Sequence, residues 1–238
     1  MNVLHWLDST ALVLDYLRHA LPQGQESVDC IGLIGSASLA LLQNKDSIGP
    51  SWGPPSDYDV FVCGRWARNE DTFRSMVMQV VFMIMRREGN IIHEITPNYT
   101  TYGRLGVKRT LVNVHLTNIQ HVLSFISCPD CKDLHEVAAA FDIDVCRVIY
   151  RPLTGAIECD DSVREHIKAG VAVVECFDFG REGLSRKNIR LLQKTLIRIW
   201  KYKNRGFKFL NEGGVEFRKQ QSRRIMSQVT KADAAARP

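Results

Sequence analysis

Two aspartates spaced two residues apart, Asp57 and Asp59, stand at the head of an apolar run that ends at Cys63. In an extended strand, side chains at positions i and i+2 point to the same face, so the two carboxylates would lie side by side. Neighbouring carboxylates repel each other unless a cation lies between them. Mg²⁺ commonly links one or two carboxylates to the phosphates of a substrate. The pair therefore predicts a site for Mg²⁺, with Mn²⁺ as the alternative ion.

A glycine-serine pair, Gly35 and Ser36, follows a second apolar run and precedes a helical pattern from Ala37 to Gln43. Glycine lets a backbone turn come close to a ligand, and the N–H groups at the start of a helix attract anions. We therefore expect a phosphate group to approach this turn closely.

The order of strand, Gly-Ser, helix and Asp-x-Asp strand resembles the nucleotidyltransferase fold of the DNA polymerase β superfamily. Residues 54–62, 141–146 and 201–207 are similar to nucleotidyltransferase-like proteins of large viruses, phages and some fungi. The resemblance implies metal-dependent transfer of a nucleotidyl group from an NTP to a hydroxyl acceptor, nucleic acid among the candidates. It implies that the phosphate at Gly35 and Ser36 belongs to this nucleotide. It also leaves open an inactive relative that binds nucleic acid in a viral or mobile-element assembly, and a transferase that modifies proteins or small molecules.

Superfamily members hold two metal ions with three carboxylates, so the resemblance implies a third acid beside the aspartate pair. The strand that normally supplies it matches residues 111–116, which offer Asn113 and His115 but no acid. Asp142, and less favourably Asp144, is the alternative donor. Asp57, Asp59 and Asp142 are therefore the expected catalytic and metal-binding residues.

Asp142 also has a structural interpretation, as a buried carboxylate that caps a turn or pairs with Arg147. An acid next to Phe141 in a strand would be costly without a partner, which favours a role of Asp142 in the site. Without a third acid at the site, two-metal binding would weaken, and a catalytically inactive protein that still binds its ligands is the alternative.

Positive charge is concentrated near the C-terminus. Residues 1–180 hold 15 Lys and Arg against 22 Asp and Glu, whereas residues 181–238 hold 16 against 4. Such a basic segment on an acidic body is typical of proteins that bind a polyanion. Four basic residues, Lys194, Arg198, Lys201 and Arg205, recur at helical spacing and predict one phosphate-binding face of a helix. Of these four, we expect Lys194, Lys201 and Arg205 to contact the nucleotide. The alternative is a solvated face with Ile197 and Trp200 packed beneath it.

The seven cysteines form no regular disulfide framework, which favours a reducing compartment, the cytoplasm or nucleus, with association to a virion as a further option. Cys128 and Cys131, with His121 and His135 nearby, allow a zinc site, but one Cys-x-x-Cys motif favours free thiols in a turn. No apolar run is long enough to cross a bilayer, so no membrane partner is expected. The oligomeric state stays open.

Alternating strands and helices predict an α/β (α+β) fold, a nucleotidyltransferase-type mixed sheet flanked by helices, with a C-terminal helical basic segment. The expected parts are a core over residues 1–150, a helical basic segment over 151–212, and a basic, flexible tail over 213–238. Expected helices span 3–21, 37–44, 70–87, 118–126, 161–170 and 189–204. Expected strands span 29–34, 57–63, 91–96 and 109–117, and a last strand combines residues 141–146 with 148–150.

Overall fold

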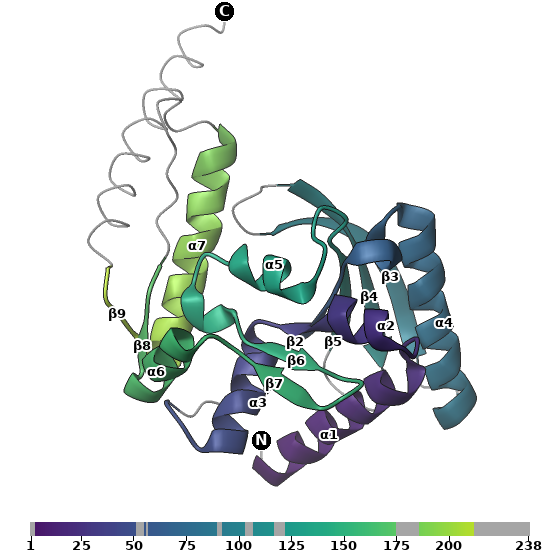
Figure 1. The fold of residues 1–238 in the computed structure, drawn as a ribbon, viewed down its shortest axis with the longest axis horizontal. Coiled ribbons are helices and arrows are strands. Elements are labelled where there is room, and N and C mark those ends of the chain that lie inside the picture. Colours follow the sequence, from purple (N-terminus) through teal and green to yellow (C-terminus); the bar gives the residue numbers. More distant parts are fainter. Residues whose placement is uncertain are drawn as a thin grey trace, which may run out of the picture.

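The computed structural model describes residues 3–50, 55, 57–89, 92–102, 107–116, 122–174 and 186–211. Figure 1 shows a mixed sheet flanked by helices, which confirms the predicted fold class. The strands are β1 (Ile31–Ile34), β2 (Asp57–Val62), β3 (Ile92–Tyr102), β4 (Val107–Leu116), β5 (Val122–Ser127), β6 (Ile149–Arg151) and β7 (Ala156–Glu158), with a separate pair, β8 (Val171–Ala172) and β9 (Lys208–Phe209). The helices are α1 (Val3–Ala20), α2 (Gln25–Cys30), α3 (Ser36–Asp46), α4 (Glu70–Glu88), α5 (Leu134–Ala139), α6 (Asp161–Ala169) and α7 (Arg186–Asn204), with two short 3-10 helices, η1 (Gly64–Ala67) and η2 (Asp144–Cys146).

The seven strands of the main sheet follow the order β3-β4-β5-β2-β1-β6-β7. β2 pairs with β5 in parallel, and every other neighbouring pair is antiparallel. β6 and β7 extend the sheet beyond β1, and β7, which ends at Glu158, forms one of its edges. β2 therefore lies in the middle of the sheet, with three strands on either side.

Two hydrophobic clusters cover the two faces of the sheet. Tyr58, Val60 and Val62 pack on one face with the apolar sides of α1 and α4. Phe61 and Ile126 pack on the other face with residues of α3, α5, α6 and α7. This alternation along β2 is the period-2 pattern of a strand buried between two helical layers. It fixes which β2 side chains share a face.

The predicted bounds of two helices, 70–87 and 161–170, are confirmed to within one residue by α4 and α6. Asn69 begins α4 as an N-cap, and its Oδ1 accepts a hydrogen bond of 2.8 Å from the Thr72 N–H. Gly170 ends α6 in the left-handed conformation, as expected for a glycine after the last turn of a helix. The residues just before α7 and the predicted tail over 213–238 lie outside the described residues.

Three local predictions are wrong. Residues 122–126, expected to be helical, belong to β5, where pairing with both β2 and β4 overrides the local signal. Residues 29 and 30 end α2 instead of opening β1. Residues 141–146, expected to be a strand, form an irregular segment that contains η2 and a single bridge between Ile143 and Val174.

The segment 141–146 misled the prediction because its polar residues are as buried as its apolar ones. Asp142 is 1% exposed and Asp144 6% exposed. The alternation of apolar and acidic residues therefore does not separate a buried face from a solvated one.

None of the described helices is long and apolar enough to cross a membrane.

Candidate functional site

The aspartate pair lies at the start of β2, in the middle of the sheet. Asp57 and Asp59 are both half-buried, whereas Tyr58 between them is fully buried in the opposite cluster. The two carboxylates therefore project from the same face of the sheet as Phe61, as the spacing predicts. A pair of acids on one face of a central strand could hold a cation together with oxygen ligands from another source.

The glycine-serine turn adjoins this pair. β1 runs antiparallel to β2 with Leu33 opposite Val60, so one further step in this register sets Ile34 opposite Asp59. Gly35 follows at once as the N-cap of α3, with φ at 102°, and Ser36 is the first residue of the helix. Gly35 and Ser36 thus lie at the end of β1 beside the Asp57 and Asp59 end of β2.

Backbone conformation, more than space, requires glycine at position 35. A φ of 102° is strained for any residue with a Cβ. A Cβ added there would meet the Phe141 ring at 3.7 Å, which is ordinary contact. Gly35 is the N-cap residue of α3 and, having no side chain, gives the first N–H groups of this helix no side-chain cap.

On β5 and β4, the strands beyond β2, the residues in register with Asp59 are polar but carry no charge. Asp59 is in register with Ser124 of β5, and Ser124 is in register with Asn113 of β4. The Ser124 hydroxyl donates a 3.0 Å hydrogen bond to the Asn113 Oδ1. Next to Asp59, where the resemblance implies a third acid, the sheet therefore carries a hydroxyl and an amide. Among the described residues, no group of three or more His, Cys, Asp or Glu could hold a metal ion.

Asp142 has a different set of partners. The Thr195 hydroxyl donates a 2.5 Å hydrogen bond to one carboxylate oxygen, and Arg198 forms an ion pair with the other. Both partners belong to α7. The structure thus attaches Asp142 to the C-terminal helix and does not join it to Asp57 and Asp59 in a metal centre. The structural interpretation of a paired, buried carboxylate holds, although Arg147 donates to the Phe141 carbonyl at 2.9 Å and the ion pair is with Arg198.

Both carboxylate oxygens of Asp144 also have polar partners within the protein. One of its oxygens accepts 2.8 Å hydrogen bonds from the backbone N–H groups of Val145 and Val173. The other lies 2.6 Å from Nδ1 of His166 on α6. These contacts attach η2 to α6 and to the segment that follows it, so Asp144 has a structural role.

The predicted basic stripe consists of Lys194, Arg198 and Lys201 on α7 and of Arg205, which directly follows the last residue of this helix. Lys194 is exposed, Lys201 is half-buried, and the Arg205 guanidinium lies 5.3 Å from the centre of the Tyr202 ring. Among the side chains described from residue 193 to the end of the helix, Thr195, Ile199 and Tyr202 are buried. Ile197 and Trp200, which the alternative interpretation of a solvated face packed beneath the stripe, are each 67% exposed. The outer side of α7 therefore presents an aromatic ring and an aliphatic chain to solvent.

Four cysteines from three segments meet beyond the end of β2. The Cys63 thiol donates to the Cys30 carbonyl at 3.3 Å, and the backbone N–H of Gly64 donates to the Cys131 carbonyl at 3.1 Å. Cys128 is buried with them. Burial and the neighbouring thiols raise the pKa of Cys63, which disfavours a thiolate. His135 lies apart, 3.3 Å from Glu158, and His121 is outside the described residues.

Ser124 is the site residue that the sequence interpretation missed, because its segment was assigned to a helix. The run Val122–Ser127 is rich in large apolar residues and only six residues long, which is the length of a strand. Those two signals could have identified β5.

No family model matches this chain, and no curated protein matches it. The nucleotidyltransferase resemblance therefore remains a proposal that depends on the elements and residues described above.

Proposed function

We propose that this protein belongs to the nucleotidyltransferase fold superfamily and transfers a nucleotidyl group from a metal-bound NTP to a hydroxyl acceptor. The observation that carries the proposal is the pair Asp57 and Asp59, on one face of the central strand, beside the Gly35 turn at the start of α3. Acidic ligands for a cation and a backbone turn suited to phosphates are the two parts that a site for a magnesium nucleotide needs.

The residues present suit one Mg²⁺ or Mn²⁺ ion. Mg²⁺ keeps several waters and is usually held by one or two carboxylates together with substrate phosphates, so Asp57 and Asp59 are a sufficient protein contribution. When bound, the ion would neutralise charge on the phosphates and lower the pKa of the attacking hydroxyl. A second ion held by Asp142 is not part of the proposal, because Asp142 pairs with Arg198.

The chain's own groups would orient the nucleotide. The Gly35 turn and the Ser36 hydroxyl are suited to the triphosphate, whose negative charge the N-terminus of α3 favours. Ser124 and Asn113, next to Asp59 in the sheet, supply neutral hydrogen-bonding groups. Lys194, Lys201 and Arg205 would neutralise further phosphates, and the exposed Trp200 could stack on a base of a nucleic-acid acceptor.

The compartment follows as part of the same proposal. All six cysteines among the described residues are thiols, and five of them are buried. Thiols of this kind and an NTP substrate suit a reducing compartment, so we infer that the protein acts in the cytoplasm or the nucleus.

The test is incorporation of an α-labelled NTP into nucleic-acid acceptors in Mg²⁺ or Mn²⁺. Asp57→Asn and Asp59→Asn should each lower the rate at least about 100-fold, because each removes a charge from the cation site. Asp130→Asn is the matched control, since Asp130 is an exposed aspartate in the turn after β5. Equal rates in all four proteins would overturn the assignment of the site.

A second candidate function is nucleic-acid binding without catalysis. The neutral residues Ser124 and Asn113, where a third acid is expected, favour it. This candidate predicts no incorporation with any acceptor. It also predicts binding that weakens with salt, ignores Asp57→Asn and is reduced by Trp200→Ala. Metal-dependent NTP binding that Asp57→Asn abolishes would support the catalytic proposal instead.

A further inference from the structure

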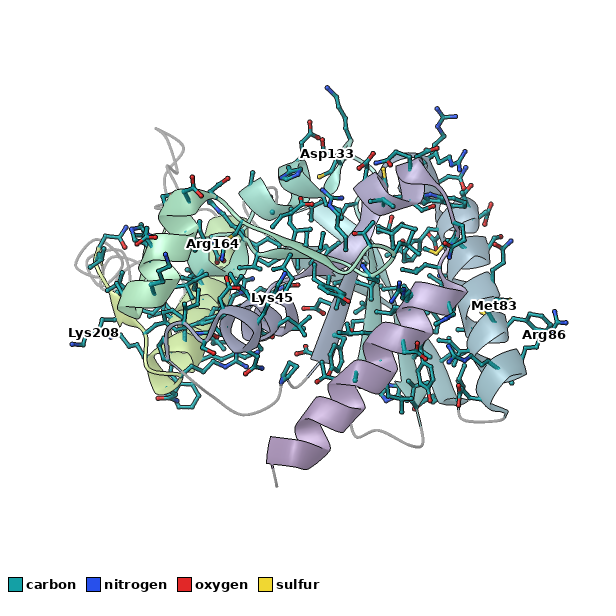
Figure 2. All side chains as sticks on the ribbon, turned by 60° about the horizontal axis from the view of Figure 1, so that its bottom comes forward. Lys45, Met83, Arg86, Asp133, Arg164 and Lys208 are labelled. Carbon is teal, nitrogen blue, oxygen red and sulfur yellow. The ribbon has the colours of Figure 1, made fainter. Side chains whose placement is uncertain are left out.

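The outer side of α4 exposes an unusual number of large apolar residues. Met78 is 50% exposed, Phe82 63%, Met83 42% and Met85 38%. Figure 2 shows Met83 and Arg86 standing out from this helix at the edge of the molecule. The inner side of the helix already supplies Phe73, Met76, Val77, Val80, Val81 and Ile84 to the core. Methionine and phenylalanine are enriched at protein interfaces, which makes this face a candidate for one.

A groove runs beside this face, between α4 and the end of α1. Its volume is about 680 Å³, and its walls include Leu21, Pro22, Ser75, Met78 and Phe82. Ser75 is the smallest side chain that α4 contributes to it. The groove could therefore receive a large side chain at Ser75, one helical turn before Met78 and two before Phe82.

Two charged residues on the outer side of α4 lack an ion pair among the described residues, and they have opposite signs. Glu70 pairs with Arg74 at 2.6 Å, and Arg87 pairs with Asp15 at 2.7 Å. Asp71 and Arg86, both exposed, have no such partner within the described part of the chain. At 3.6 residues per turn they are about 60° apart around the helix and about 22 Å apart along it.

Asp71 and Arg86 flank the apolar residues on a single stripe. At about 100° per residue, the stripe occupies an arc of about 80°. Its members in chain order are Asp71, Ser75, Met78, Phe82 and Arg86. An acid thus stands at one end, a base at the other, and apolar side chains between them. When a second copy of this helix packs against the first in the antiparallel direction, the acidic end of each stripe meets the basic end of the other.

We propose that α4 is the interface of a two-fold symmetric dimer, in which it packs antiparallel against α4 of a second copy of this chain. With the axis between Met78 and Gln79, Asp71 lies opposite Arg86 of the partner subunit. Phe82 then lies opposite Ser75 of the partner subunit and enters the groove beside it. Because the interface is isologous, each of these contacts occurs twice.

A second copy fits this face better than other occupants. A membrane surface would favour basic residues at both ends of the stripe, whereas Asp71 is acidic. The interface would also lie on the α1 and α4 side of the sheet, opposite the face that carries Asp57 and Asp59. The proposal is therefore independent of the proposed function.

The first test is the mass of the full chain in solution by sedimentation equilibrium, up to roughly 100 μM, where a dimer with a Kd of about 10 μM would dominate. Phe82→Glu should weaken the dimer at least about 100-fold, because it places two charges in the apolar contact. Trp200→Glu, a change at an equally exposed aromatic on α7, is the matched control and should leave the dimer intact. A monomeric wild-type chain, or a dimer that survives Phe82→Glu, would overturn the proposal.

A charge exchange tests the antiparallel direction. Asp71→Arg and Arg86→Asp should each weaken the dimer about tenfold, because each sets two like-charged pairs across the axis. The double variant should restore the wild-type affinity, since each exchanged residue again faces an opposite charge. Both positions are exposed, so the variants should fold, which circular dichroism checks. Additive losses in the double variant would exclude this packing.

Discussion

Asp142→Asn should destabilise the folded protein, because Asp142 belongs to a buried charge network. The carboxylate is 1% exposed, and the substitution leaves the Arg198 guanidinium on α7 without its counter-charge. Removal of one partner from a buried ion pair costs about 3–5 kcal/mol. The Arg198 side chain is 24% exposed, so water compensates in part and we expect about 3 kcal/mol.

Urea unfolding followed by circular dichroism would measure this loss, with an unchanged m-value as the sign that only stability has changed. For a chain of this size, 3 kcal/mol corresponds to a fall in Tm of roughly 6–12 °C. Asp130→Asn, at an exposed turn, is the control and should stay within about 0.5 kcal/mol of wild type.

A double-mutant cycle with Arg198→Met separates the pair from its surroundings. The double variant should be more stable than the sum of the two single losses implies, because neither charge is then left alone. The reasoning would be refuted if Asp142→Asn kept wild-type stability but abolished nucleotide incorporation. That result would make Asp142 the third acid of the site.

Three further substitutions and one labelling experiment test other features. Gly35→Ala should lower the free energy of unfolding by about 1–3 kcal/mol, because the φ of residue 35 is 102°. It should also weaken NTP binding in a fluorescence titration. Wild-type stability together with wild-type NTP binding would contradict the proposed role of the turn. Asn69→Ala should cost about 1 kcal/mol, measured as a lower Tm, since it removes the N-cap of α4. The Arg151 guanidinium lowers the pKa of Glu158 below its ordinary 4.5, so the contact stabilises the fold above pH 4.5 and this stabilisation is lost as the pH falls through the lowered pKa. Glu158→Gln should therefore lower the free energy of unfolding at neutral pH and change it little in acid. An equal cost at both pH values would argue against the ion pair. Burial raises the pKa of Cys63, so under iodoacetamide this thiol should be labelled only on unfolding and later than the half-buried Cys159; mass spectrometry would show the order.

The central part of the candidate site was predictable because its signals are local. Asp57 and Asp59 alternate with buried apolar residues within one strand, and Gly35 stands between a strand and a helix. Each pattern depends on a few consecutive residues. The sequence therefore sufficed to place the pair on one face and the glycine at a turn.

The role of Asp142 was not predictable, because its partners are far away in the sequence. Thr195 and Arg198 lie more than 50 residues downstream, on α7. Nothing in the segment 141–146 indicates that its acids point at a later helix. The same limit applies to α7, where helical spacing grouped the basic residues but did not show that Trp200 faces solvent.

The parallel contact between β2 and β5 has a consequence for how the chain folds. β3, β4 and β5 form a local meander, and β1 and β2 form a second antiparallel unit; six residue pairs along one parallel seam join the two. Sequence-distant pairing of this kind is slow to form, so we expect the seam to close late in folding. Asp57 and Asp59 lie on that seam, beside Val122 and Ser124. The acids and the Gly35 turn belong to the β1 and β2 unit, whereas Ser124 and Asn113 reach Asp59 only across this seam, so these neutral hydrogen-bonding groups would join the acids late in folding.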